Sequence, residues 1–93
     1  MEIDMNEQTI ERFILENLFQ GKKRKAIGLD QSLVSSGTLD SLWMLRLIGF
    51  VEETTGLIID DGEVTPENFE TIRKIMEFVE RKSRVENAVQ ANP

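Results

Sequence analysis

Apolar residues recur every three or four positions along most of the chain, which is the spacing of one face of an α-helix. The first such segment is predicted to begin near Asp4, where Glu7 completes an Asp-x-x-Glu capping pattern. Gly21 stops it, so this helix is predicted to end at residues 19–20. Its inward face consists of Ile10, Phe13, Ile14 and Leu18.

A second predicted helix runs from Ser41 to Thr55 and ends at Gly56, a residue suited to a left-handed C-cap. Its core side consists of Met44, Leu47, Ile48 and Val51. Leu42 and Leu45 fall near the opposite side, where most amphipathic helices carry polar groups. Leu42 and Leu45 either form an apolar patch that faces a partner or are covered by the preceding loop. The sequence pattern does not distinguish these two alternatives.

The rest of the chain is predicted to contain a connection and two more helical segments. Residues 56–62 are predicted to form an extended connection, and residues 65–69 a short helical turn that Thr65 caps and Pro66 begins. Thr71 then caps a final helix. The inward face of that helix consists of Ile72, Ile75, Met76 and Val79. The periodicity therefore predicts an all-α fold.

Length and composition remove most enzyme classes. A chain of 93 residues is one small domain, able to bury about 60–65% of the surface that it exposes when unfolded. It contains no histidine and no cysteine, which excludes Ser-His-Asp hydrolysis, a thiol nucleophile, disulfides and a His/Cys zinc site. No apolar run is long enough to span a bilayer and no signal peptide is recognisable, so we expect a cytoplasmic protein.

The net charge of −6 is concentrated in the middle of the chain. Residues 26–72 carry nine acidic residues and one basic residue, Arg46. This balance argues against binding to nucleic acid and favours partners with basic surfaces, although the acids could equally serve only to keep a small protein in solution. The opposite charge gathers in Lys22 to Lys25, either a solvated loop or a docking element.

Asp40 and Ser41 stand where this acidic loop meets the second helix. Both residue types are favoured at helix starts, so the pair can be a cap and nothing more. A helix N-terminus also offers unpaired N–H groups and a partial positive charge, which suit a phosphate esterified to a serine. The dipeptide alone does not separate these two interpretations.

The surrounding residues resemble the acyl carrier protein family, which includes peptidyl and aminoacyl carriers. The resemblance covers roughly residues 5–82, in the order helix, long loop, helix, short turn and helix. The matching segments are Leu33-Val34, Gly37, Asp40-Ser41-Leu42, Glu52-Glu53, Gly56-Leu57-Ile58 and Thr65 to Ile72.

The resemblance implies that a separate phosphopantetheinyl transferase attaches 4′-phosphopantetheine from coenzyme A to Ser41. The arm would carry acyl groups as thioesters for a ligase, synthase or acyltransferase with a basic docking surface, so the chain itself is not an enzyme and needs no metal. The implied recognition residues are Asp40, Leu42, Trp43, Leu45, Arg46, Glu52 and Glu53.

Trp43 and Arg46 stand where housekeeping fatty-acid carriers typically have acidic residues. We therefore expect a specialised carrier in a lipid, secondary-metabolite or cell-envelope pathway. An aminoacyl or peptidyl carrier is one alternative, and an unmodified helical adaptor that binds basic partner surfaces is another. A catalytic serine is disfavoured because the chain lacks a Gly-x-Ser-x-Gly pattern.

The element order and the resemblance together predict a small antiparallel four-helix bundle. This monomeric domain over residues 1–82 would contain three main helices and one short helix, which is the third in chain order. A long loop would separate the first and second helices. After Lys82 the sequence turns polar, so residues 83–93 are predicted to be a flexible tail.

Overall fold

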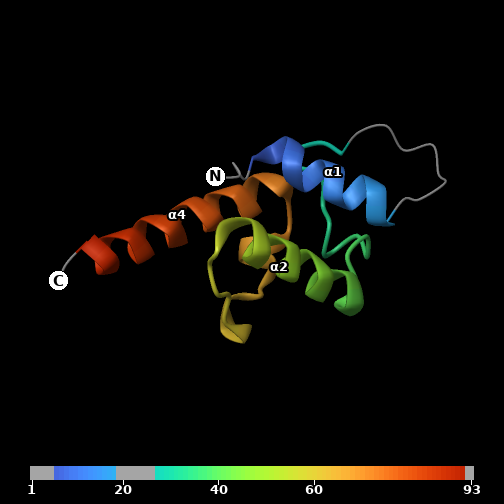
Figure 1. Cartoon of the computed structure of the whole chain (residues 1–93). Helices are drawn as coiled ribbons and strands as arrows, with labels where there is room; N and C mark the ends of the chain where they lie inside the picture. Colours follow the sequence, from blue (N-terminus) through green and yellow to red (C-terminus); the bar gives the residue numbers. More distant parts are fainter. Residues whose placement is uncertain (1–5, 19–26, 92–93) are drawn as a thin grey trace.

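Four α-helices and one 3-10 turn make up the computed structural model, which describes residues 6–18 and 27–91 (Figure 1). No strand occurs in these ranges, so the all-α prediction is confirmed. None of the helices within them is long and apolar enough to cross a membrane. In chain order the elements are α1 (Glu7–Leu18), α2 (Ser41–Thr55), η1 (Asp61–Glu63), α3 (Pro66–Phe69) and α4 (Ile72–Ala91).

Helix α1 begins later than the sequence predicts. Asn6 is not helical and caps the helix, because its side-chain oxygen accepts hydrogen bonds from the Thr9 amide at 2.9 Å and the Thr9 hydroxyl at 3.0 Å. Asp4, from which the sequence predicts the capping pattern, lies outside the described residues. So do Gly21, Lys22 to Lys25 and the helix end predicted at residues 19–20.

Helix α2 has the predicted bounds because both of its ends carry strong local signals. Asp40 caps the first turn, and Gly56 adopts the left-handed conformation at φ 79°, where its amide donates to the Glu52 carbonyl at 2.8 Å. Leu47 and Val51 are fully buried, as the periodicity predicts. Met44, predicted on the same core side, is only half-buried.

The core gathers side chains from all four helices and from the connections between them. Phe69 of α3 is fully buried and its ring lies 5.5 Å from that of Phe78 in α4. On another side Phe13 of α1 stacks on Phe50 of α2 at 4.5 Å. The buried residues from the helices and connections include Ile10, Ile14, Ile27, Leu33, Leu39, Ile48, Leu57, Ile59, Ile72, Ile75 and Val79.

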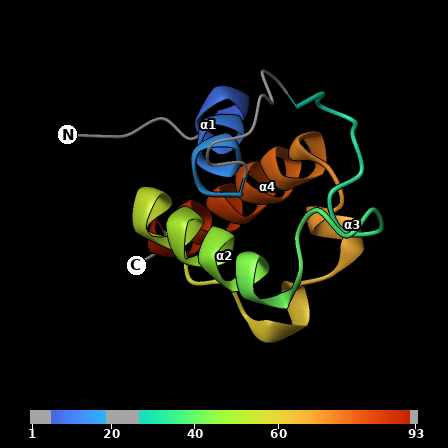
Figure 2. The ribbon, with the colours of Figure 1, turned by 90° about the vertical axis from the view of Figure 1, so that its right-hand side faces the viewer.

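The segment that leads to α2 is held by carboxylates at several points. The Ile27 amide donates to Glu11 of α1 at 2.7 Å. Asp30 accepts two hydrogen bonds from the Arg73 guanidinium, the shorter of which is 2.8 Å. This segment passes beside α3 before α2 begins (Figure 2). Its path is therefore fixed by contacts to α1 and α4 rather than by its own regular structure.

Glu70, which follows α3, holds the same segment nearer to α2. Its carboxylate accepts hydrogen bonds from the Ser32 hydroxyl and from the Ser35 amide, the latter at 3.1 Å. Its carbonyl accepts from the Leu33 amide at 2.7 Å. One residue thus anchors the backbone and the side chains of the segment that ends at Asp40.

These contacts predict that stability falls at acid pH. The hydrogen bond from Arg73 lowers the pKa of Asp30 below its usual 3.8, and the hydrogen bond from Ser32 lowers the pKa of Glu70 below its usual 4.5. Folding therefore favours the ionised forms, and this contribution is complete above the usual pKa values and lost as pH falls through the lowered ones.

We expect the urea midpoint of unfolding to be level between about pH 7 and pH 5 and to fall below about pH 4. Glu70→Gln is expected to lower the midpoint at neutral pH and to make the acid decline shallower, because one of the titrating groups is gone. A natural chain whose midpoint stays level down to about pH 2 would contradict this assignment.

Helix α4 continues beyond the point where the sequence predicts a tail. It runs to Ala91, so residues 83–91 are helical, whereas the sequence predicts a flexible tail from residue 83. The reason is local: neither proline nor glycine occurs between Ile72 and Pro93, and Glu80 pairs with Arg84 at 3.3 Å, one turn apart. In Figure 1 this end of α4 projects away from the other helices.

Candidate functional site

Ser41 is the first residue of α2 and its side chain is exposed. Asp40 fixes the start of the helix, because its side-chain oxygen accepts from the Trp43 amide at 3.0 Å and its carbonyl accepts from the Met44 amide at 2.8 Å. Asp40 is therefore a helix cap, as the sequence allows. The serine that follows it projects from a rigid turn.

No hydrogen bond to the Ser41 hydroxyl occurs within the part of the chain that the structure describes, and the amides of Ser41 and Leu42 are likewise unpaired there. The first amides of a helix have no partner within the helix, and they give this end a partial positive charge. Chemically, the position can present a hydroxyl to another protein and stabilise an anion attached to it.

The loop before Ser41 closes on itself and is pinned to the core. The Leu39 amide donates to the Leu33 carbonyl at 2.8 Å, and both side chains are buried. Between them, Gly37 has a φ of 82° and its amide donates to the Val34 carbonyl at 3.0 Å. A left-handed turn of this kind favours glycine, which gives a physical reason for the glycine in the Gly-x-x-Asp-Ser-Leu pattern.

Two adjoining open hollows lie beside Ser41, and they share Met44 and Val64. The larger, of about 330 Å³, lies between α2 and the connection that follows it; the smaller, of about 210 Å³, extends to the start of α3. The larger is mostly apolar, with the single charged residue Asp61 among its lining. Its remaining side chains are Leu45, Ile48 and Ile59. Sequence reasoning did not find these hollows, because they form between residues far apart in the chain.

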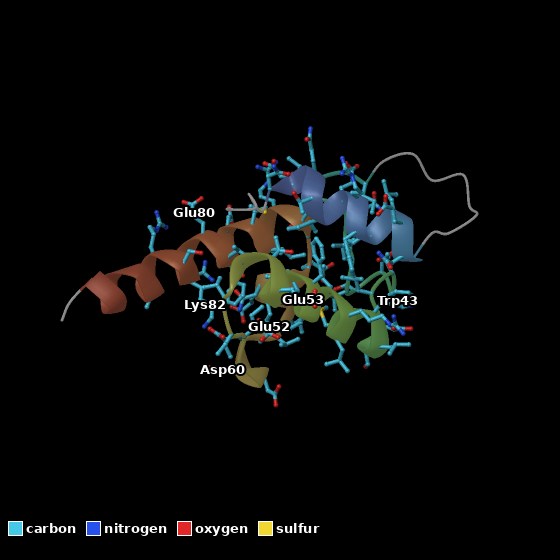
Figure 3. All side chains as sticks on the ribbon, viewed as in Figure 1. Trp43, Glu52, Glu53, Asp60, Glu80 and Lys82 are labelled. Atoms are coloured by element: carbon cyan, nitrogen blue, oxygen red, sulfur yellow. The ribbon has the colours of Figure 1, made fainter. Side chains whose placement is uncertain are left out.

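The sequence does not decide whether Leu42 and Leu45 are exposed or covered by the preceding loop. In the structure both are exposed, Leu42 at 55% and Leu45 at 68%. The preceding segment, as far as the structure describes it, therefore does not cover them. Trp43 is half-buried against the core, and the Arg46 guanidinium lies over its ring at 5.1 Å from the centroid. All four residues lie in the first two turns of α2, which begins at Ser41. Figure 3 labels Trp43 at this end of the helix.

The two glutamates near the other end of α2 differ in their surroundings. The Glu52 carboxylate is half-buried and accepts from the Ile59 amide at 2.8 Å, which holds the extended connection against the helix. Glu53 is exposed. Figure 3 labels both. The structure thus gives Glu52 an internal role, and its part in partner recognition stays a prediction.

A polar contact ties the wall of the larger hollow to α4. Glu63 accepts from the Asp60 amide at 2.9 Å and pairs with Lys82 at 3.1 Å. The amide of Asp60, and secondarily Lys82, lowers the pKa of Glu63. Lys82, at the predicted end of the final helix, is therefore a residue that positions η1, and no pattern in the sequence indicates this pairing across 19 positions.

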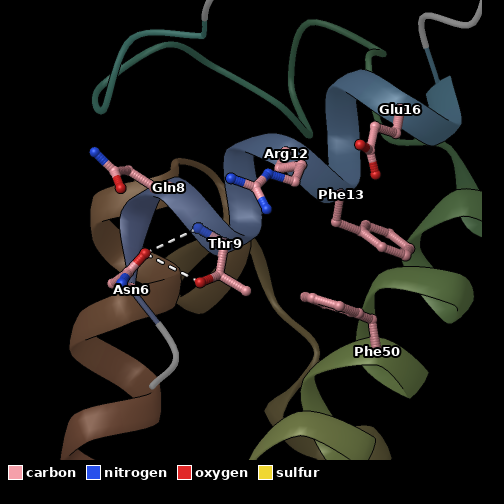
Figure 4. A pocket seen from close by; sticks show the side chains of 7 residues that line it. All are labelled: Asn6, Gln8, Thr9, Arg12, Phe13, Glu16 and Phe50. Carbon is pink, nitrogen blue, oxygen red and sulfur yellow. Dashed lines mark hydrogen bonds between the residues drawn. The ribbon is translucent and has the colours of Figure 1, made fainter. Parts of the chain in front are cut away.

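A further hollow of about 370 Å³ lies between α1 and α2, with the stacked rings of Phe13 and Phe50 on one side and Arg12 on another (Figure 4). It shares no lining residue with the two hollows beside Ser41. It is therefore a separate feature, on which no sequence motif falls.

The geometry defines a class of protein: a small all-helical chain with an exposed serine at a capped helix start, next to an apolar hollow. No protein-family model matches the chain, and no curated protein matches its sequence.

Proposed function

We propose that this chain is an acyl carrier protein that holds acyl intermediates as thioesters on a 4′-phosphopantetheine arm attached to Ser41. The observation that carries the proposal is the exposed Ser41 hydroxyl, without a hydrogen-bond partner in the described structure, at the start of α2. The residues present fit the group, because a phosphodiester at this position lies beside the unpaired first amides of the helix.

The attachment step needs a second protein, the transferase. The Ser41 oxygen bonds to the phosphorus that bears pantetheine in coenzyme A, the phosphoanhydride bond breaks, and adenosine 3′,5′-bisphosphate leaves. The hydroxyl proton passes to a base of the transferase. A chain without histidine or cysteine suits this division of labour, since it supplies the acceptor hydroxyl and no imidazole or thiol base.

The hollow beside Ser41 favours an acyl cargo over an aminoacyl one. Met44, Leu45 and Ile48 present apolar surface next to the attachment point, and apolar groups gain free energy when such surface removes them from water. An aminoacyl group would place an ammonium beside this apolar surface, where Asp61 is the one charged residue of the lining that could pair with it. The aminoacyl carrier therefore remains the second candidate.

The proposed function also implies a particular arrangement of the helices. We expect α1 to α4 to form an antiparallel four-helix bundle with a long loop between α1 and α2, acting as a monomer in the cytoplasm. Its partners would be a phosphopantetheinyl transferase and a ligase, synthase or acyltransferase of a specialised lipid, secondary-metabolite or cell-envelope pathway. Trp43 and Arg46 support a dedicated pathway. A synthase whose docking surface suits acidic carriers would meet an aromatic ring and a positive charge here, to which that surface is not complementary.

The direct test is the intact mass of the chain after incubation with coenzyme A and a broad-specificity phosphopantetheinyl transferase. We expect the mass to rise by one phosphopantetheine group, and Ser41→Ala to remain unmodified. Ser36→Ala is the matched control, because this exposed serine lies five positions earlier, and it should be loaded normally. Repeated failure to load a folded natural chain would favour the unmodified adaptor instead.

A further inference from the structure

The outer face of α2 carries side chains that the attachment of an arm does not use. They form a line along the helix at helical spacing, and we call this line the outer strip. Two exposed leucines begin it, a positive charge follows, and a negative charge ends it. The members are Leu42, Leu45, Arg46, Gly49 and Glu53.

The positive charge of the outer strip is Arg46. Its guanidinium lies on the Trp43 ring, and it forms no ion pair within residues 6–18 and 27–91. It is also the one basic residue among nine acidic ones in residues 26–72. A guanidinium held over an aromatic ring is pre-organised to receive a carboxylate, because less side-chain freedom is lost on binding.

The negative charge is Glu53, seven positions further on. Seven helical residues span two turns, or about 10 Å along the axis, on the same side of the helix as Arg46. Glu53 is exposed and its carboxylate has no hydrogen bond or ion pair in the described structure, whereas the carboxylate of the adjacent Glu52 accepts from Ile59. The strip therefore offers one unpaired charge of each sign at a fixed spacing.

Gly49 lies between the two charges. Glycine weakens the interior of a helix relative to alanine. A Cβ atom built at Gly49 would meet nothing within 4 Å, so no neighbour in the described structure requires glycine there. Because glycine has no side chain, the helix backbone is accessible between Arg46 and Glu53, and the backbone of another protein can approach it closely there.

We propose that the outer strip docks one amphipathic helix of a partner protein, packed closely over Gly49, with a carboxylate of that helix facing Arg46 and a basic group facing Glu53. The inference rests on the proposed function only in that the partner would act on the group carried by Ser41. A uniformly basic partner surface would match Glu53 but be repelled by Arg46, so the pair of charges selects against it.

Two synthetic, covalently stapled helical peptides test the proposal on the unmodified, ¹⁵N-labelled chain. Both have the same leucine-rich face with a small residue at its centre. The mixed peptide carries Glu and Lys seven positions apart, and the basic peptide carries Lys at both positions. We expect the mixed peptide to bind about tenfold more tightly, with amide shift changes confined to α2, and Arg46→Glu to reverse the order.

Equal affinities, no binding of either peptide, or self-association of the chain through α2 would each overturn the proposal. Gly49→Leu is expected to weaken binding of the mixed peptide about tenfold while the circular dichroism spectrum stays helical. Gly62→Leu is the matched control, because a Cβ there also meets nothing within 4 Å, and it should leave the affinity unchanged.

An unchanged affinity for Gly49→Leu would overturn the close packing over the glycine. Because the peptides are titrated against the unmodified chain, this experiment does not depend on the arm. A chain that loads at Ser41 but ignores the charges of the peptides refutes the docking proposal alone, and a chain that cannot be loaded refutes the carrier function alone.

Discussion

Replacing Phe69 with alanine is expected to destabilise the fold by about 3–5 kcal/mol. The side chain is fully buried and its ring packs against Phe78, while α3, which has four residues, contributes no other buried side chain. Small domains have total stabilities of about 5–15 kcal/mol, so this single change removes a large share. Urea unfolding followed by circular dichroism measures the loss.

Phe69→Leu is the control for this prediction, because it keeps an apolar side chain in the same site and leaves a smaller cavity. It should cost less than the alanine variant, since the cost of a core truncation grows with the volume left empty. A loss below about 1 kcal/mol for Phe69→Ala would contradict the position of α3 in the core.

Leu47→Ala is expected to destabilise the fold by about 2–5 kcal/mol, whereas Leu45→Ala should change it by no more than about 0.5 kcal/mol. The two leucines lie two positions apart on α2, yet Leu47 is fully buried and Leu45 is 68% exposed. The same substitution on the same helix therefore isolates the effect of burial. Urea midpoints of the two variants and the natural chain make the comparison.

Comparable losses for both leucines would mean that Leu45 is covered in solution. The apolar hollow beside Ser41 would then be closed rather than open, since Leu45 lines it. A loss of stability for Leu47→Ala alone would support the assignment of Leu47 to the buried face of α2 and of Leu45 to its exposed face. Both proposals depend on this assignment.

Helix α2 could be predicted to the residue, because a capping aspartate and a left-handed glycine mark its two ends. The other helices were less predictable where such signals compete or are missing. For α1 the sequence predicts a start near Asp4, whereas Asn6 is not helical and caps the helix. For α4 the polar composition after Lys82 pointed to a tail, although nothing in it prevents a helix.

The position of Ser41 at a helix start followed from the sequence, but the contacts that surround it did not. Glu70 reaches back 35 positions to Ser35, and Lys82 reaches back 19 positions to Glu63. Each contact depends on how the helices pack, which local patterns do not encode. The hollow beside Ser41 could not be predicted for the same reason.

Net charge alone does not show which acidic side chains already have contacts within the chain. Several acids in the middle of the chain accept hydrogen bonds within it and so help to hold the fold. A partner therefore meets fewer uncommitted carboxylates than the sequence suggests. The acids with these internal contacts are Asp30, Asp40, Glu52, Glu63 and Glu70.

The most direct test of the central claim is fragment mass spectrometry of the chain purified from the cells that naturally produce it. The account predicts phosphopantetheine on Ser41, with or without an acyl group on its thiol. A chain that is unmodified throughout, or one that carries the group on Ser32, Ser35 or Ser36 instead, would contradict it.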